Sequence, residues 1–261
     1  MIKEYENGNQ LVDDNRLFLD ENKYMSMFFY LDASLLTEVN ENNYGLKVED
    51  NNHKLVALKV ERYNLLLYGD VECLDELMSF IINKNYNHSG IMCSTLIGDK
   101  LIKDYSFMVE ISMDFMETTE YTEESSNEVI IANENDVDEI FECVKQFIID
   151  CGLSDKPKKE SIIRDYKDFR LIKEDNKIVS MAALSLGTED SLKIAYVFTR
   201  SEYRGKGYAR KVVNYLKNEI LNQGKIATLN VDKQNPISNH LYESLGFKKV
   251  FSQGVYSKKQ Q

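Results

Sequence analysis

"VFTRSEYRGKGYARKVV", residues 197–213, places two glycines, Gly205 and Gly207, among five cationic side chains and one anionic side chain. The chain as a whole has a formal net charge of -11, so this local excess of positive charge stands out. The run "SLKIAYVF" before it predicts a strand. The apolar spacing after it predicts a helix that ends at Gly224. The first N–H groups of a helix lack partners and carry partial positive charge, and glycines let a ligand approach the backbone closely. The stretch therefore predicts an anion site for a phosphate or a pyrophosphate.

Two common phosphate-binding loops do not fit this stretch. The P-loop pattern G-x-x-x-x-G-K-[ST] needs more residues between its glycines and a Ser or Thr that is absent here. The dinucleotide pattern G-x-G-x-x-G needs a third glycine where Arg210 stands. A G-x-G turn taken alone is also compatible with an exposed basic helix start that binds nothing.

The second half of the chain predicts a mixed sheet with helices on its faces. After the polar, acidic segment 116–128, the hydrophobic pattern predicts the element order β-α-α-β-β-β-α-β-α-β-β. The predicted strands are "EVIIAN" (128–133), "DFRLIKE" (168–174), "KIVSMAALSLG" (177–187), "SLKIAYVF" (191–198), "KIATLNV" (225–231), "KKVFS" (248–252) and "VYSKK" (255–259). Segment 116–128 is the predicted boundary between a domain of residues 1–120 and a domain of residues 128–261.

The first half shows a weak echo of the second. "YGLKVEDNNHKLVAL" (44–58) aligns with "FRLIKEDNKIVSMAAL" (169–184), and each predicts strand-turn-strand, although such short matches also arise by chance. The next strand of the first half leads into a helix that starts with Asp70, Glu72 and Asp75 and has no glycine pair. A phosphate would be repelled there, so we expect no cofactor loop in this half.

Composition narrows the class of protein. The 261 residues are 43% hydrophobic and 29% charged, and the polar N-terminus is not a signal peptide. The longest apolar run, residues 25–36, is broken by Asp32 and is too short to span a membrane. The acidic balance argues against nucleic-acid binding. Scattered cysteines are typical of a reducing cytoplasm, and His53, His88 and His240 lack metal-ligand spacing, so we predict a cytoplasmic protein without a metal.

Three motifs in this order resemble the GNAT acetyltransferase superfamily. "RGKGYA" is similar to its pyrophosphate loop [QR]-x-x-G-x-[GA], through Arg204, Gly207 and Ala209. "IAYVFTRSEY" is similar to its central strand, and "NPISNHLYESLGF" to its signature N-x-x-[SA]-x-x-x-Y-x-x-x-G-F. The resemblance covers residues 128 to about 257. Residues 1–115 resemble, less closely, a degenerate GNAT-like half. The resemblance to this superfamily implies an α/β fold: a mixed, mostly antiparallel GNAT-type sheet with helices on both faces. A second, smaller α/β GNAT-like domain would precede this domain in the chain.

The resemblance also implies a set of site residues. Coenzyme A would place its pyrophosphate on the backbone of Arg204, Gly205, Lys206, Gly207, Tyr208 and Ala209. Its pantetheine arm would lie along Val197, Phe198 and Thr199, where this strand splays from residues 225–231. Backbone N–H groups near Val197 or Phe198 would polarise the thioester carbonyl.

Two residues of the second signature complete the implied site. Asn235 would touch the arm or cap its helix, and Tyr242 would protonate the leaving thiolate, although Tyr242 could also be a packed aromatic. The central strand offers Lys193 and Tyr196 but no carboxylate, so we expect water to deprotonate the amine.

The expected function is transfer of an acetyl group from acetyl-CoA to a primary amine of a small molecule or peptide, by direct attack in a ternary complex. No nucleic-acid or membrane partner is expected. The alternative is a non-catalytic module that binds or senses coenzyme A, or binds a partner. Retention of Tyr242 and Asn235 beside an intact loop favours the enzyme, and the missing strand carboxylate favours the alternative.

Overall fold

The computed structural model describes residues 1–123, 127–153 and 156–258, which form two compact units. Unit 1 comprises Met1–Asp114, Asp232–Gln234 and Phe251–Gln261, and unit 2 comprises Phe115–Val231 and Asn235–Val250. Residues 124–126 of the predicted boundary, and residues 259–261, lie outside the described residues. Among the residues described, no helix is both long and apolar enough to cross a membrane.

The first five strands of unit 1 follow the order β1-β2-β3-β4-β5, of which β1 to β4 are antiparallel and β4 and β5 are parallel. Its elements, followed by β6, are β1 (Ile2–Tyr5), α1 (Gly8–Asp20), α2 (Lys23–Ala33), β2 (Tyr44–Asp50), β3 (His53–Lys59), β4 (Leu65–Gly69), the 3-10 turn η1 (Val71–Cys73), α3 (Leu74–Asn83), β5 (Gly90–Ser94), α4 (Thr95–Tyr105) and β6 (Phe107–Thr118).

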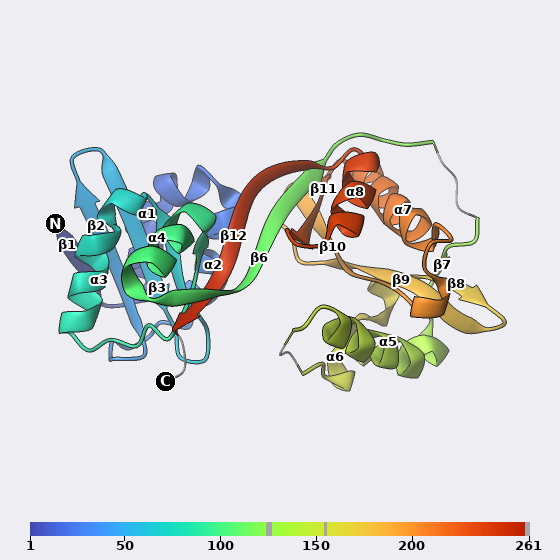
Figure 1. The fold of residues 1–261 in the computed structure, drawn as a ribbon, viewed down its shortest axis with the longest axis horizontal. Helices are drawn as coiled ribbons and strands as arrows, with labels where there is room; N and C mark the ends of the chain where they lie inside the picture. Colours follow the sequence, from blue (N-terminus) through green and yellow to red (C-terminus); the bar gives the residue numbers. More distant parts are fainter. Residues whose placement is uncertain (124–126, 154–155, 259–261) are drawn as a thin grey trace. The chain divides into compact units, whose positions relative to one another are not determined.

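Unit 2 repeats this order of elements (Figure 1). Its strands β7, β8, β9 and β10 are antiparallel neighbours, and β10 and β11 are parallel. The elements are β7 (Ile130–Ile131), η2 (Glu134–Asp136), α5 (Val137–Asp150), α6 (Lys159–Asp165), η3 (Tyr166–Asp168), β8 (Phe169–Glu174), β9 (Lys177–Ser185), β10 (Ser191–Thr199), η4 (Ser201–Tyr203), α7 (Tyr208–Asn222), β11 (Ile226–Asp232), α8 (Pro236–Ser244) and β12 (Lys248–Lys258).

The predicted fold class is confirmed: each unit is a mixed, mostly antiparallel sheet with helices on both faces. In unit 2, α7 and α8 bury one face and α5 and α6 bury the other. In unit 1, α3 and α4 cover one face while α1 and α2 cover the other. The hairpin at Asp175 and Asn176 is also confirmed: both residues have positive φ, 49° and 63°, as a type I′ turn requires.

The last strand of the chain differs from its prediction. Residues 248–252 and 255–259 were expected to form two strands, but 248–258 form the single strand β12, and Lys259 lies outside the described residues. From Gln253 to Ser257, β12 pairs antiparallel with β5 of unit 1. Tyr256 is 2% exposed in the unit 1 core. The predicted limits 1–120 and 128–261 therefore differ from the compact units, because the end of the chain completes the sheet of the first half.

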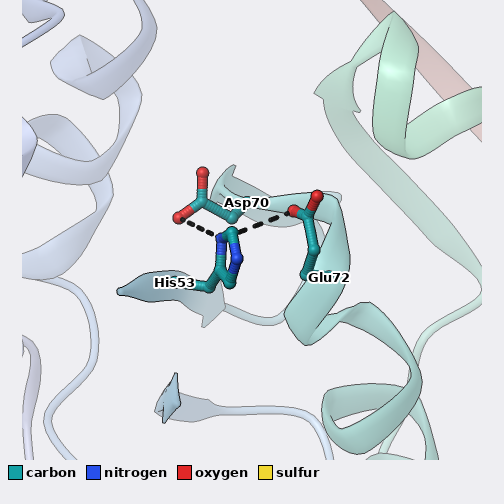
Figure 2. A group of neighbouring side chains, drawn as sticks. All are labelled: His53, Asp70 and Glu72. Carbon is teal, nitrogen blue, oxygen red and sulfur yellow. Dashed lines mark ion pairs between the residues drawn. The ribbon is translucent and has the colours of Figure 1, made fainter. Parts of the chain in front are cut away.

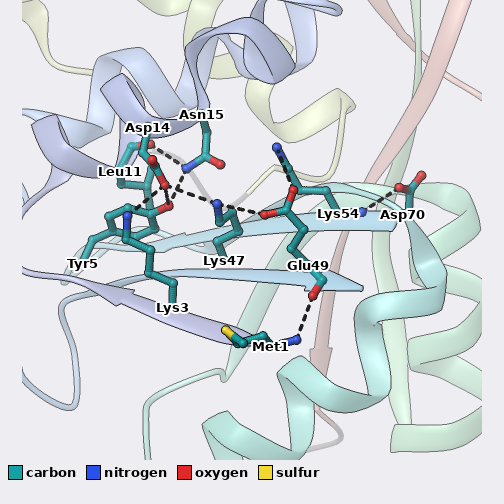
Figure 3. Close-up of polar contacts among 10 residues, drawn as sticks. All are labelled: Met1, Lys3, Tyr5, Leu11, Asp14, Asn15, Lys47, Glu49, Lys54 and Asp70. Carbon is teal, nitrogen blue, oxygen red and sulfur yellow. Dashed lines mark hydrogen bonds and ion pairs between the residues drawn. The ribbon is translucent and has the colours of Figure 1, made fainter. Parts of the chain in front are cut away.

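A polar network fastens helix α1 to the unit 1 sheet. Figure 3 shows Asp14 facing Tyr5, Lys3 and Lys47, which come from β1 and β2. The Asp14 carboxylate accepts hydrogen bonds from Lys3 Nζ at 3.0 Å and Lys47 Nζ at 3.3 Å, and a short one from the Tyr5 hydroxyl. These donors, Tyr5 foremost, hold the pKa of Asp14 well below its usual range.

Candidate active site

Strand β10 leaves its neighbour β11 partway along its length. The parallel register between them covers Ser191 to Ile194 of β10, opposite residues 226–229, whereas β10 itself runs on to Thr199. On its other side, the register with β9 shifts between Ala195 and Phe198. Tyr196 and Val197 therefore form a bulge, with Tyr196 at φ 53°. The strand expected to carry the pantetheine arm leaves the β11 register where the arm is expected.

The loop after β10 ends in two glycines of left-handed backbone. Gly205 has φ 78° and Gly207 has φ 80°, and α7 begins at Tyr208. A side-chain carbon added at either glycine would meet no heavy atom within 4 Å. Within the described part of the chain, the backbone N–H groups of residues 205–209 donate no hydrogen bond. A helix start with free amides and open space above its glycines is suited to hold an anion.

Helix α7 is fixed on the sheet by its apolar stripe and by one ion pair. Val212, Val213, Leu216 and Ile220 are fully buried. On the side facing β8, Glu219 receives both Arg170 Nε, at 2.8 Å, and Arg170 Nη2. This two-point pairing limits rotation of the helix and so fixes where its N-terminus points.

Most of the cations around the loop are engaged by carboxylates of unit 2. Arg200 Nη2 contacts Glu139 at 2.9 Å, Arg204 Nη2 contacts Asp150 at 2.5 Å and Lys211 Nζ contacts Glu128 at 2.7 Å. Lys206 lies 4.8 Å from the ring centroid of Tyr203, and Arg210 Nη1 donates to Ser244 Oγ at 2.7 Å. The arginine and lysine side chains that pair with carboxylates therefore add less positive charge to the loop than the sequence indicates. The backbone amides and Lys206 contribute more of it.

The other loop and strand residues have definite partners. The Tyr208 hydroxyl donates to Glu174, and this hydrogen bond raises its pKa to about 12. The Phe198 carbonyl accepts from Ser180 Oγ at 3.0 Å, and the Thr199 carbonyl accepts from Arg204 Nε at 3.0 Å. The side chain of Phe198 is buried under α5, whereas Val197 packs toward α7. Ala209 is half-buried in the first turn of α7.

Asn235 caps the helix that follows it, which is one of the two roles that the sequence predicted for this residue. Its Oδ1 accepts from the backbone N–H of Ser238 at 3.0 Å, and Pro236 occupies the first turn of α8. Its side chain lies at the surface.

Tyr242 is 6% exposed in the core between α7, α8 and the sheet. Its ring meets Phe247 edge-on, with centroids 6.1 Å apart. Within the described residues its hydroxyl has no hydrogen-bond partner, and burial raises its pKa far above the ordinary value, with a smaller contribution from the nearby Cys151 thiol. The hydroxyl therefore stays protonated at any working pH. Cys151 follows α5 directly, so its approach to Tyr242 could not be read from the sequence.

The helix of unit 1 that corresponds to α7 is α3, and its N-terminus has a different structure. There η1 leads directly into α3, without the residues that form the glycine loop of unit 2. Figure 2 shows the His53 ring between the carboxylates of Asp70 and Glu72, each 3.7 Å from His53 Nδ1. Asp70 also accepts the backbone N–H of Lys54 at 2.8 Å (Figure 3). The acidic start of this helix thus faces a histidine and a backbone amide.

The donor atoms of His53, Asp70 and Glu72 all lie within 4.8 Å of one another. Such a set can hold a metal ion in principle, although all three side chains are substantially exposed. The sequence spacing gave no indication of this group because His53 opens β3 and Asp70 follows β4, and the pairing of these strands brings them together.

Comparison with known proteins agrees with this architecture. Residues 133–247 match the family model of the acetyltransferase (GNAT) family. A GCN5-related N-acetyltransferase from Sphaerobacter thermophilus is 12% identical over 99% of this chain and 95% of its own, with a TM-score of 0.68. An acetyltransferase of the GNAT family from Colwellia psychrerythraea is 16% identical over the whole of both chains, with a TM-score of 0.63. A GCN5-related N-acetyltransferase from Kribbella flavida is 13% identical over 82% of this chain and 90% of its own, with a TM-score of 0.54. At these identities the solved structures show the shared fold, and no curated protein matches the chain significantly.

Proposed function

We propose that this chain, whose residues 133–247 match the family model of the acetyltransferase (GNAT) family, is an N-acetyltransferase that moves an acetyl group from acetyl-CoA to a primary amine. The observation that carries the proposal is the loop before α7. Gly205 and Gly207 present free backbone amides and open space, next to the point where β10 leaves the β11 register. Acetyl-CoA would supply an acetyl group activated as a thioester.

The residues of unit 2 fit the parts of this cosubstrate. The amides of residues 205–209 and the Lys206 ammonium would hold the pyrophosphate. The strand edge at Val197 would hold the pantetheine arm as an added strand. The register with β9 is interrupted at the bulge of Tyr196 and Val197, and we assign a backbone N–H of this bulge to donate to the thioester carbonyl.

The reaction exchanges one bond for another. A neutral amine forms a bond from its nitrogen to the acetyl carbon while the carbon–sulfur bond breaks, and the surplus proton of the amine passes to water. We assign Tyr242 as the donor to the leaving sulfur. With its pKa raised by burial, the phenol holds its proton firmly, so it acts chiefly as a hydrogen-bond donor to the developing thiolate.

Thiol release with an amine panel, together with calorimetry of acetyl-CoA, tests the proposal. The full chain should bind one acetyl-CoA, because unit 1 has no glycine loop, and should release coenzyme A only when an amine is present. Tyr242→Phe keeps the ring and its packing but removes a hydrogen-bond donor to the developing thiolate, so turnover should fall about 10²–10³-fold while binding hardly changes.

The wild-type rate should rise with pH as the amine loses its proton, without a fall up to about pH 10, the ordinary pKa of a tyrosine. Tyr256→Phe, at a buried tyrosine of unit 1, is the matched control. Acetyl-CoA binding without release for any amine would favour the non-catalytic alternative. A Tyr242→Phe rate within threefold of wild type would refute the role of the phenol.

A further inference from the structure

The face of the unit 2 sheet beneath α5 changes from apolar to polar between β9 and β11. Ile194 and Leu229 pair in register and both pack in the α7 core. Since side chains alternate along a strand, Lys193, Thr228 and Asn230 lie on the opposite face. On that face the apolar cluster under α5 includes β8, β9 and Phe198 of β10, but no residue of β11 among those described. The polar residues therefore continue the α5 face where its apolar core stops.

Lys193 is a half-buried cation without a partner. Its ammonium makes no hydrogen bond or ion pair with any residue that the structure describes. Burial lowers its pKa. A cation that is removed from water is destabilised unless an anion lies close to it. The chain has 43 acidic residues, and none of those described forms an ion pair with Lys193.

Asn230 has a hydrogen-bond acceptor without a donor among the described residues. Its Oδ1 is buried and accepts no hydrogen bond. The neighbouring Thr228 hydroxyl does not supply one, because it donates to the Leu192 carbonyl at 3.1 Å. Buried polar atoms in proteins nearly always have partners, so Asn230 Oδ1 is an acceptor to which a donor group of a ligand can bind.

The two groups lie at the point where β10 leaves β11. Lys193 is in register with Thr228, and Asn230 is two residues further along the same face. The register ends at Ile194 and Leu229, so Asn230 is the first residue of β11 beyond the pairing. Ala195 and the Val197 bulge follow Lys193 directly along β10. The unpaired cation and the unpaired acceptor therefore stand beside the strand segment assigned to the thioester.

We propose that Lys193 and Asn230 form the acceptor subsite and select an amine that carries a carboxylate close to its nitrogen, as an amino acid does. This inference rests on the proposed function. The carboxylate pairs with the Lys193 ammonium, and an amine N–H donates to Asn230 Oδ1, which leaves the nitrogen lone pair for the acetyl carbon. An amino acid whose amine is neutral and whose carboxylate is ionised thus satisfies both unpartnered groups at once.

Matched acceptor pairs test this on the full chain. Each pair is an amino acid and the amine left after removal of its carboxylate, for example phenylalanine with phenethylamine and alanine with ethylamine. The wild type should acetylate the amino acid of each pair with the higher kcat/KM. Lys193→Met keeps the apolar stem and should lower kcat/KM for amino acids by about 30-fold or more, mostly through KM. It should leave the decarboxylated amines within about threefold, the ordinary scatter of a neutral change.

Three further variants separate recognition from folding. Lys193→Arg should restore part of the preference for amino acids because it restores the charge. Lys225→Met, at the residue before β11, should leave the preference unchanged. Asn230→Leu should weaken both members of each pair, since both present an amine.

Three results would overturn the inference. Equal use of both members of each pair by the wild type would exclude a carboxylate subsite. Equal loss on both members in Lys193→Met, or a loss confined to kcat with a shifted pH profile, would assign Lys193 to proton transfer or to the fold. Acetyl-CoA calorimetry keeps the proposals apart: intact binding and turnover without acid preference overturn only the subsite, whereas absent binding overturns the proposed function and the subsite with it.

Discussion

Replacing Gly207 by alanine tests the cofactor loop most directly, because the chain contains its own control. Gly207 and Gly224 lie at the two ends of α7, with φ 80° and 72°. At both positions an added side-chain carbon would meet no heavy atom within 4 Å. The two substitutions therefore impose the same backbone strain and no clash.

The expected stability change is the same for both variants. A left-handed backbone costs an L-residue about 1–2 kcal/mol relative to glycine. Both alanine variants should lower the free energy of unfolding by that amount and remain folded, which thermal or urea melts will report.

The expected change in acetyl-CoA affinity differs between them. The added methyl group at Gly207 stands where the phosphate must approach the amides at the start of α7. Loss of one hydrogen bond to a charged group costs about 1.5–3 kcal/mol, which is roughly 10- to 150-fold in affinity. Gly207→Asp adds a negative charge and should lower affinity further, whereas Gly224→Ala and Gly224→Asp should bind like the wild type.

Isothermal calorimetry of the wild type and the four variants measures this contrast. Wild-type affinity in both Gly207→Ala and Gly224→Ala would refute the assignment of the pyrophosphate to this loop. Equal loss in both would show that the defect follows stability instead of contact with the ligand.

Two further predictions concern unit 1. Tyr256→Ala should destabilise the protein by about 3–5 kcal/mol, because this β12 side chain fills the unit 1 core against Gly98, and a melt of unit 1 that stays unchanged would contradict that role. Asp14 has a pKa held low in the folded state, foremost by Tyr5, so its contribution to stability is present above the unfolded value near about 4 and is lost as pH falls below it. Asp14→Asn should therefore lower stability at pH 7 and flatten its decline in acid, whereas the exposed neighbour Asp13→Asn should leave the acid profile unchanged in urea melts.

Local patterns in the sequence determined much of unit 2. The glycine pair, the apolar stripe of α7 and the positive-φ hairpin at Asp175 and Asn176 are short-range features, and each formed as predicted because backbone preference acts over a few residues. The element order of the second half as far as α8 followed from hydrophobic periodicity for the same reason.

Only the tertiary structure decided where charges and strands found their partners. The cations of the glycine loop pair with Glu139, Asp150 and Glu128, which are distant in sequence. β12 completes the sheet of the first half, a long-range pairing that no local pattern encodes. In the sequence, Lys193 and Asn230 are ordinary polar residues of predicted strands. Only the structure shows that the β10–β11 register places them on one face and that neither the Lys193 ammonium nor Asn230 Oδ1 has a partner among the described residues. Ion pairing, strand exchange and burial depend on contacts across the whole chain, so the fold had to form before these groups acquired their properties.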